Sequence, residues 1–320
     1  MNRAPTISTL AAVILAGAVH AQEFPQRPIR FIVPNPPGGS NDLLARLTAP
    51  RMNETWGQPV VIDNRPGAAG NIGAELAAKA PPDGYTIVVT SMSTAISMTY
   101  YRKLGYDVLR DLQGVSLFST QPNVLVAGPA STVRTIAELS AVAKGKAGQI
   151  TYGTPGTGSS QHMMGELLKI SGRIDLVHVP YKGTGPALND LIGGQVTLVF
   201  SPLVSAIPHM KTGRVRALAV TSPKRAPATP DVPTMIESGV PGYDVVSWYG
   251  VHTAAKAPRA IVDKLNQEIN RILSLPDVRE RLSGLGMDPS PISVDKFNAM
   301  VASEVTRWAK VIKEAGIRQE

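Results

Sequence analysis

Short apolar segments alternate with amphipathic segments along most of the chain. Eight of the apolar segments have the length and composition of buried strands: residues 29–33, 59–62, 85–90, 123–127, 149–152, 176–179, 195–200 and 216–220. Between many of them lie segments with apolar residues at helical spacing, at 40–56, 71–79, 135–144 and 185–192. Apolar strands separated by helices are typical of mostly parallel sheets covered by helices, so the pattern predicts an α/β fold.

The last third of the chain contains two longer amphipathic helices. Their apolar faces are formed by Ile261, Leu265, Ile269 and Ile272, and by Phe297, Val301, Trp308 and Ile312. A helix with one apolar face must cover other structure, so we expect both helices to pack back onto the first part of the chain. The predicted organisation is one lobe from residues 22–122 and 223–320, with a second lobe, residues 123–222, inserted between them.

The N-terminus has the features of a secretory signal peptide. Arg3 precedes an apolar stretch at residues 7–19, and Val19 and Ala21 are small residues at the −3 and −1 positions of a cleavage site. The stretch is shorter than the roughly 20 apolar residues that a transmembrane helix needs. We therefore expect residues 1–21 to be removed and an exported mature chain to begin at Gln22.

Composition excludes several kinds of chemistry. The sequence has no cysteine, which excludes a disulfide framework, a thiol nucleophile and a cysteine-ligated metal. The net charge is +8, but the basic residues are scattered and form no basic helix, so nucleic acid is not an expected partner. The 29 glycines and 27 prolines indicate many tight turns between short elements.

Two glycine-rich segments each connect a predicted strand to a predicted helix. The first is Pro34-Asn35-Pro36-Pro37-Gly38-Gly39-Ser40-Asn41-Asp42, and the second is Gly153-Thr154-Pro155-Gly156-Thr157-Gly158-Ser159-Ser160. A turn of this kind leaves backbone N–H groups unpaired at the positive end of the helix dipole, which favours an anion. One such segment in each lobe predicts a carboxylate or similar anion held between the lobes.

Small, polar or glycine-bearing residues follow five of the predicted strands. They lie at 36–42, 91–94, 154–160, 181–183 and 201–202. Ligands of open α/β sheets bind at the carboxyl ends of the strands, so these segments predict a shared crevice. At 181–183 we expect the hydroxyl of Tyr181 to face the crevice more than the cation of Lys182. Asp42 fits a helix-capping role better than an anion-binding role.

Other chemistry is weakly supported. Ser159 or Ser160 with His162 could indicate a hydrolase, but there is no G-x-S-x-G motif, and neighbours at a helix start do not meet as nucleophile and base. No H-E-x-x-H or Walker A motif occurs, and the glycines at 67–73 have the spacing G-x-x-G-x-x-G. We therefore expect no catalytic residue, no metal and no cofactor.

An ordered set of motifs resembles one family over the whole mature chain. The segments are 24–30, 33–42, 63–73, 82–85, 106–107, 152–162, 178–183, 218–221 and 231–234. They include Asp63-Asn64-Arg65-Pro66-Gly67 and His178-Val179-Pro180-Tyr181-Lys182-Gly183; the ordered set is highly specific, although each motif alone is weak. The chain resembles the solute-binding receptors of the tripartite tricarboxylate transporter family, also called Bug or TctC-type receptors.

The resemblance implies a periplasmic protein with a type II periplasmic-binding-protein fold that closes on a small carboxylate. It also implies a membrane permease partner with a large and a small subunit, and we expect the receptor itself to be a monomer. By position, the first wall of the cleft would be Pro37, Gly38, Gly39, Ser40 and Asp42. The opposing wall would be Thr154, Gly156, Thr157, Ser159 and His162, with Ser91, Tyr181 and Ser201 beside it.

One departure from the family pattern concerns the ligand. Many members have an acidic residue after the phenylalanine at Phe200, where this chain has Ser201. An acidic side chain could bind an ammonium group, so its absence favours a di- or tricarboxylate or an aromatic carboxylate over an amino acid. A sensory receptor for a membrane kinase would bind the same ligands, and a periplasmic serine hydrolase is a further alternative.

Overall fold

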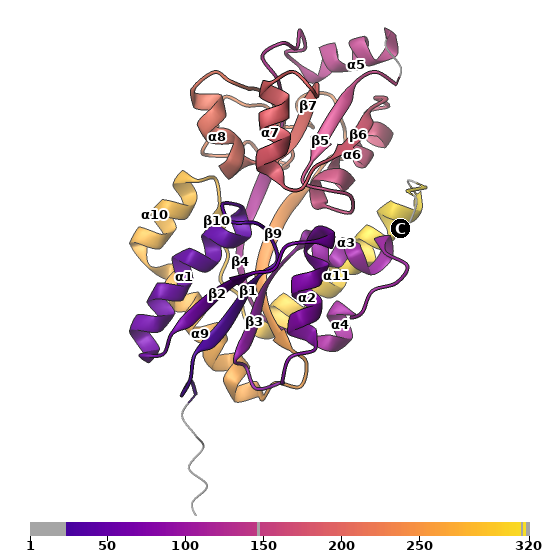
Figure 1. Ribbon diagram of the computed structural model, residues 1–320. Coiled ribbons are helices and arrows are strands. Elements are labelled where there is room, and N and C mark those ends of the chain that lie inside the picture. The colour runs from indigo at the N-terminus through magenta and orange to yellow at the C-terminus, as the bar shows by residue number, and fades with distance from the viewer. Residues whose placement is uncertain (1–23, 146–147, 315, 318–320) are drawn as a thin grey trace, which may run out of the picture.

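The computed structural model describes residues 24–145, 148–314 and 316–317, and within them the chain forms two lobes joined by extended strands (Figure 1). The predicted signal peptide and its cleavage site lie outside the described residues. The lower lobe in Figure 1 contains β1 (Ile29–Val33), β2 (Val60–Asn64) and β3 (Thr86–Ser91), which pair in parallel in the order β2-β1-β3. β9 (Val246–Ala254) then pairs antiparallel with β3.

Helices cover both faces of this sheet. Phe31 and Val33 point to one face, where they pack in a core with α1 (Ser40–Trp56), α9 (Arg259–Ser274) and α10 (Pro276–Gly284). Ile32 points to the other face, toward α2 (Asn71–Ala78), α3 (Met92–Tyr100) and α11 (Val294–Glu314). The alternation follows from the two-residue period of a strand, and it explains why β1 is apolar at almost every position.

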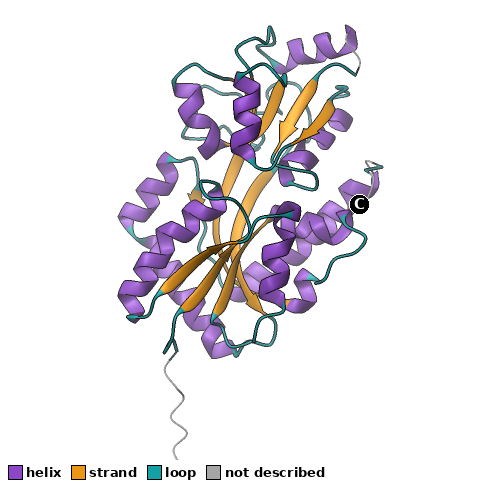
Figure 2. Cartoon of the chain, viewed as in Figure 1, coloured by secondary structure: helices purple, strands orange, loops and turns teal. Residues whose placement is uncertain are grey.

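The upper lobe has a smaller sheet of its own. β5 (Thr151–Thr154) pairs in parallel with β6 (Val177–Pro180) and β7 (Leu198–Pro202). Around them lie α5 (Ile136–Gly145), α6 (Ser160–Ser171), α7 (Thr184–Ile192) and α8 (Leu203–Lys211), with β8 (Arg216–Val220) at the edge of the sheet. Figure 2 shows this arrangement of helices around the upper strands.

One long strand belongs to both sheets. β4 (Leu112–Ala127) follows the short helix α4 (Val108–Asp111), and its residues 112–122 pair antiparallel with β9. Its residues 123–127 pair with β7 and β8 instead, so the change of partner falls between Pro122 and Asn123. The two-residue strand β10 (Asp288–Pro289) also pairs with β4, and the three-residue helix η1 (Ala68–Gly70) precedes α2.

The sheet is mixed, which corrects the expectation of mostly parallel pairing. That expectation holds for β1, β2 and β3 and for β5, β6 and β7. It is wrong at β4, β8 and β9, all of which pair antiparallel. The sequence patterns had located only the last five residues of β4 and had not located β9.

The two amphipathic helices of the last third pack as expected. The apolar face of α9 is buried in the core that it shares with α1, and α9 also contacts β4. The apolar face of α11 is buried in the other core, where α11 contacts α3 and β4. These contacts confirm that the C-terminal helices cover the sheet formed by the first part of the chain.

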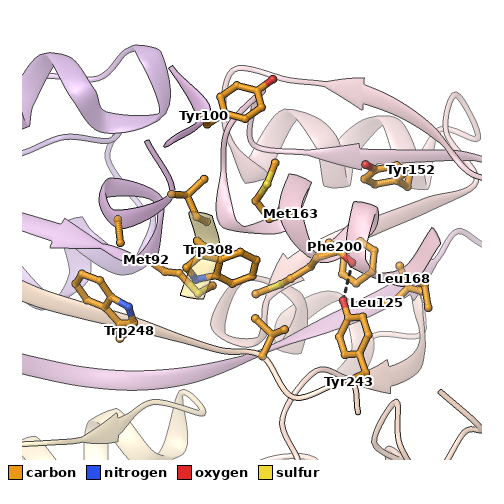
Figure 3. Close-up of a cluster of buried hydrophobic side chains, with 14 of the residues drawn as sticks. Met92, Tyr100, Leu125, Tyr152, Met163, Leu168, Phe200, Tyr243, Trp248 and Trp308 are labelled. Atoms are coloured by element: carbon orange, nitrogen blue, oxygen red, sulfur yellow. Dashed lines mark hydrogen bonds between the residues drawn. The ribbon is translucent and has the colours of Figure 1, made fainter. Parts of the chain in front are cut away.

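The second core runs from one lobe into the other. Met92, Trp248 and Trp308 of the lower lobe and Tyr152, Met163 and Phe200 of the upper lobe belong to the same buried cluster (Figure 3). Tyr243 lies in it too, and its hydroxyl donates to the backbone carbonyl of Met164 at 2.7 Å. The part of β4 that passes from the lower lobe to the upper lobe is therefore packed on one side by apolar side chains of both lobes.

We predict that Gly250→Ala destabilises the protein. A methyl group at Gly250 of β9 would lie 2.1 Å from the Phe297 ring and 2.9 Å from the Ser116 carbonyl oxygen. Phe297, on α11, is fully buried, so its ring must move to make room for the methyl group. Overpacking of this kind typically lowers the free energy of unfolding by about 1–3 kcal/mol. Urea denaturation should report this loss in the free energy of unfolding.

Gly284→Ala is the matched control for that variant. No atom lies within 4 Å of a methyl group at Gly284, at the end of α10. We expect its free energy of unfolding to be unchanged or slightly higher, because alanine restricts the unfolded chain more than glycine. Equal stabilities for the two variants would show that α11 is not packed tightly against Gly250.

Candidate ligand-binding site

A cavity of about 470 Å³ lies between the lobes, with loops and helix starts from both around it. The size is typical of small-molecule sites. The lining residues are 35–41, Ala69, Ser91, Ser93, Pro155, Gly156, 159–161, 182–186, Leu188, Pro202, Val204, Ser205, Pro208, His209 and Tyr249.

The loop between β1 and α1 is held in shape by Asp42. Gly38 has a φ of +91°, a left-handed conformation that glycine adopts at little cost, and its N–H donates to Asp42 Oδ2 at 3.0 Å. Arg46 Nε donates to the same oxygen at 2.8 Å, and Asn64 Nδ2 donates to Oδ1 at 3.1 Å. Asp42 therefore fixes the loop from behind instead of presenting its charge to the cavity.

The pKa of Asp42 reflects this arrangement. Burial raises the pKa of the carboxyl. The hydrogen bonds from Arg46, Gly38 and Asn64 together lower the pKa by more than burial raises it, so the pKa of Asp42 lies below its ordinary value. The carboxylate is thus ionised at neutral pH. Since it is 3% exposed and paired with Arg46, it presents no unpaired negative charge to an incoming anion.

The start of α1 offers free hydrogen-bond donors. Gly39, Ser40 and Asn41 line the cavity, and their backbone N–H groups have no acceptor among the described residues. The first intrahelical bond of this region is donated by Leu43 to the Gly39 carbonyl. Adjacent free N–H groups at the positive end of a 17-residue helix favour a negatively charged group beside them.

The loop between β5 and α6 presents fewer free donors. Ser159 caps α6 by accepting from the His162 N–H at 3.2 Å, and the Ser160 N–H donates to Ser93 Oγ, in the lower lobe, at 3.1 Å. Of the cavity-lining residues at this helix start, only Gln161 keeps an N–H without an acceptor in the described part of the chain. The two loops are therefore unequal, and the first one carries more free donors.

The crossing strand β4 ties both helix starts together. Gln121 accepts a hydrogen bond from Ser40 Oγ, at the start of α1, at 2.9 Å. Asn123, two residues further, accepts one from Gln161 Nε2, at the start of α6, at 2.7 Å. Residues two apart point to the same face of a strand, so one face of β4 positions a helix start from each lobe.

Two histidines stack behind the second loop. The rings of His162 and His178 are 3.9 Å apart and nearly parallel, and the Gly158 N–H donates to His162 Nδ1 at 3.2 Å. Burial lowers the pKa of His162 to about 4, and burial together with the neighbouring His162 lowers that of His178 to about 3. Both rings are neutral at neutral pH, so they support the loop without adding charge to it.

The cavity lining contains no carboxylate and no arginine. Its basic side chains are Lys182, before α7, and His209, in the last turn of α8. Within the described residues, no group of three or more His, Asp or Glu side chains could hold a metal ion. The electrostatic character of the cavity thus comes from backbone dipoles, hydroxyl groups and these two basic residues.

No helix in the described ranges has both the length and the apolar character needed to cross a lipid bilayer.

Seven of the residues expected at the site line the cavity. They are Pro37, Gly38, Gly39, Ser40, Ser91, Gly156 and Ser159. They come from the loops before α1 and α6 and from the end of β3. The structure thus brings the two glycine-rich loops and one further strand end around a common space.

Six expected residues lie outside the lining: Asp42, Thr154, Thr157, His162, Tyr181 and Ser201. Asp42 and His162 brace the two loops as described above. Thr154 Oγ1 is bonded to His178 Nε2 at 2.7 Å, and Ser201 Oγ donates to the Pro202 carbonyl at 3.0 Å. The carbonyl of Thr157 accepts from Tyr101 Oη, on the lower lobe, at 3.2 Å.

Of the neighbours Tyr181 and Lys182, the structure places Lys182 in the cavity lining, whereas the sequence analysis favours Tyr181. Tyr181 donates its hydroxyl to Asp190 Oδ2 at 2.9 Å and faces away from the lining, whereas Lys182 lines the cavity. Burial, with the bond to Asp190, raises the pKa of Tyr181 to about 12.

Sequence reasoning missed the contributions of β9 and α8. Tyr249, on β9, lines the cavity, and Ser205 and His209 line it from α8. The run of β-branched and aromatic residues at 246–254 was a usable strand signal for β9. No signal marked the face of α8, since its lining residues depend on how the helix packs.

At the start of α6, neither Ser159 nor Ser160 pairs with the His162 ring as a nucleophile with its base. Ser159 Oγ accepts from the backbone N–H of His162, not from its ring. The Nδ1 atom of that ring accepts from the Gly158 N–H, and Ser160 Oγ donates to Gln161 Oε1 at 3.0 Å. The geometry gives no support to a serine hydrolase mechanism.

We predict that the protein loses stability as pH falls below neutrality. Burial lowers the pKa of His252 to about 3, as it lowers those of His162 and His178. Below pH of about 6.5 the unfolded chain binds protons that the folded chain does not, so the free energy of unfolding decreases. Each of these histidines lowers the free energy of unfolding by up to about 1.4 kcal/mol for each pH unit below its unfolded pKa.

His252→Gln tests this account. The variant removes one of the three contributions, so its loss of unfolding free energy between pH 7 and pH 5 should be smaller than that of the parent by about 2 kcal/mol. Urea denaturation at the two pH values measures both losses. The same loss in both proteins would mean that His252 is not buried in its neutral form.

Comparisons with known proteins assign the family. Residues 44–317 match the family model described as "Tripartite tricarboxylate transporter family receptor". The chain is 36% identical over 311 residues to the protein BugT of Bordetella pertussis, covering 97% of this chain and 95% of BugT.

Solved structures agree with the family model. A structure of Rpa4515 of R. palustris with adipate has a TM-score of 0.89 and 37% identity, covering 92% of this chain and 99% of that one. MatC of Rhodopseudomonas palustris with bound malate has a TM-score of 0.85 and 33% identity, covering 90% of this chain and all of that one. The chain therefore belongs to the tripartite tricarboxylate transporter receptor family.

Proposed function

We propose that this protein captures a small carboxylate in the periplasm and delivers it to a membrane permease of the tripartite tricarboxylate type. One observation carries the proposal: Gly39, Ser40 and Asn41 have free backbone N–H groups and line a cavity whose lining residues include no Asp or Glu. The ligands named for two similar structures, adipate and malate, are both carboxylates and support the same class here.

In this proposal the ligand carboxylate sits at the start of α1 and accepts hydrogen bonds from those N–H groups. The N–H of Gln161 and the hydroxyl groups of Ser91 and Ser93 complete its shell. Hydrogen bonds to a charged group contribute about 1.5–3 kcal/mol each. Because the donors are fixed before binding, little free energy is lost in ordering them.

We further propose that the lobes close on the ligand about the β4 crossing. The moving units would be residues 22–122 with 223–320, and residues 123–222. A ligand that contacts a loop from each unit binds the closed form better and shifts the population toward it. The permease would then recognise the closed monomer through surfaces of both lobes.

A thermal-shift screen tests the proposed ligand class. We expect at least one acid from a set of C4–C8 dicarboxylates, citrate and aromatic carboxylates to raise the melting temperature of the mature protein. The matched amide, which lacks the charge, should give no shift, because a ligand stabilises the folded protein only at concentrations comparable to or above its Kd. A protein that responds to no acid, or equally to acid and amide, is not a receptor of this kind.

Substitution at Gly39 tests the position of the carboxylate. Gly39 has a φ of −85°, and a methyl group there would meet only the Pro36 carbonyl oxygen, at 4.0 Å. We therefore expect Gly39→Ala to fold and to bind within about threefold of the parent. Gly39→Asp adds a negative charge beside the anion and should weaken binding at least about 100-fold, equal to about 2.7 kcal/mol.

Gly39→Asn serves as the uncharged control of the same shape. Calorimetric titration of all three variants separates charge from bulk: we expect the Asn variant to bind much more tightly than the Asp variant. If the Asp and Asn variants bind equally well, the anion does not sit at the start of α1.

A further inference from the structure

We propose that the far end of the upper lobe is a docking surface for a bilayer that contains anionic phospholipids. This distal surface consists of exposed basic side chains in the segments that connect the helices of the upper lobe to its strands, and its central residues are Arg134, Arg173 and Arg214. The inference goes beyond the proposed function, because the surface is separate from the ligand cavity. It would keep the receptor close to the membrane that holds its permease.

Positive charge is unevenly distributed along the chain. Residues 123–222, which include the strands and helices of the upper lobe, contain nine Lys or Arg and four Asp or Glu. The rest of the expected mature chain, residues 22–122 and 223–320, contains 22 Lys or Arg and 20 Asp or Glu. An excess of one sign in one part of a protein attracts surfaces of the opposite sign to that part.

The pairing of the upper strands defines one end of this lobe. Ala127, at the carboxyl end of β4, is paired with Leu198 at the start of β7 and with Arg216 at the start of β8. β5 is paired with β7 beside Leu198, and its first residue, Thr151, is paired with Val177, the first residue of β6. The first residues of β5, β6, β7 and β8 therefore lie in one row across the sheet.

The ligand cavity lies at the opposite end of the same strands. Its lining includes Pro155, residues 182–186 and Pro202, which lie at or just after the last residues of β5, β6 and β7. The connections that precede these strands are therefore on the far side of the lobe from the ligand. A partner bound there would leave the cavity accessible.

Three exposed arginines lie in the connections at this row. Arg134 precedes α5, Arg173 lies between α6 and β6, and Arg214 lies between α8 and β8. A hydrogen bond ties the first of these connections to the row: Arg216 Nη1 donates to the Val133 carbonyl, next to Arg134, at 3.4 Å. The three guanidinium groups thus belong to three separate connections at one end of the lobe.

These arginines have no carboxylate partner. Among the described residues, the ion pairs of residues 123–222 all involve Glu166, and none includes an arginine. The nearby acids Glu138 and Asp175 accept from the backbone N–H groups of Arg134 and Gly148, both at 2.7 Å. In the lower lobe, by contrast, most of the described arginines form an ion pair with a carboxylate. The distal surface therefore has cationic groups available for an external anion.

The chemistry of the distal surface fits phospholipid headgroups. Guanidinium groups are weakly hydrated and bind phosphate through two parallel hydrogen bonds. Two exposed apolar side chains accompany them: Val177, at the start of β6, is 38% exposed, and Ile170, near the end of α6, is 49% exposed. Basic side chains next to exposed apolar ones are typical of surfaces that lie at a membrane interface. Because the arginines come from separate connections, they suit a layer of many phosphates better than one bound anion.

Co-sedimentation of the mature protein with lipid vesicles tests this surface. Vesicles of phosphatidylcholine alone, and of equal parts of phosphatidylcholine and phosphatidylglycerol, differ in the charge of their headgroups. We expect the protein to bind the anionic vesicles at least about tenfold more tightly than the neutral ones at low ionic strength. Added salt should weaken this binding, because it screens charges at an exposed surface.

Charge reversal tests the location of the surface. The triple variant Arg134→Glu, Arg173→Glu and Arg214→Glu should bind the anionic vesicles at least about fivefold more weakly than the parent. All three side chains are exposed, so we expect its melting temperature to stay close to that of the parent. The preference of the parent for anionic vesicles tests the inference without any variant.

A second triple variant controls for net charge. It carries Lys264→Glu, Arg281→Glu and Lys296→Glu, at exposed residues of the lower lobe that form no ion pair in the described ranges. It should bind the anionic vesicles within about twofold of the parent, because its charges lie far from the distal surface.

Three outcomes would overturn the inference. The parent could bind both kinds of vesicle equally, or the two triple variants could lose the same amount of binding. Binding to native membrane vesicles without binding to vesicles of pure lipid would make a membrane protein the partner instead. None of these measurements involves a carboxylate, so each outcome is independent of whether the proposed ligand class is correct.

Discussion

The continuity of β4 is the constraint on which the rest of the structure depends. This strand pairs with β9 in the lower lobe and with β7 and β8 in the upper lobe. The backbone hydrogen bonds of one strand therefore connect the sheets of both lobes. From one face of the strand, Gln121 and Asn123 hold the starts of α1 and α6. The opposing walls of the cavity are therefore set relative to the same few residues, even though they belong to different sheets.

The ionisable side chains beside the two loops add no unpaired charge to the cavity. Asp42 is close to the first loop, yet its carboxylate is saturated by Gly38, Arg46 and Asn64. His162 and His178 support the second loop as neutral rings because burial lowers their pKa values. What remains at the start of α1 is the partial positive charge of free N–H groups, which favours an anion and is independent of pH near neutrality.

Local sequence patterns predicted much of the fold because they report local physics. The bounds of β1, α1 and β8 are those expected from apolar runs and from the glycine-rich turn before α1. The antiparallel insertion of β9 between β3 and β4 was missed, because strand order depends on contacts between residues far apart in the sequence. Mixed pairing therefore could not follow from the alternation of strands and helices.

The same distinction applies to the site. The glycine-rich loops were located correctly at the cavity, because a strand–turn–helix unit leaves free N–H groups wherever it occurs. The direction of individual side chains was less accessible: Lys182 lines the cavity and Tyr181 does not, although they are neighbours in one turn. His209 is a stronger example, since only the packing of α8 against α7 brings it to the cavity.

The central claim is that backbone N–H groups at the start of α1 bind the ligand's carboxylate. Titration of ¹⁵N-labelled protein with an acid that binds, followed by amide chemical shifts, tests it most directly. The account predicts that the amide protons of Gly39, Ser40 and Asn41 move downfield as they form hydrogen bonds to the carboxylate, and that the matched amide leaves them unchanged. Tight binding without a change at these three amides would contradict it.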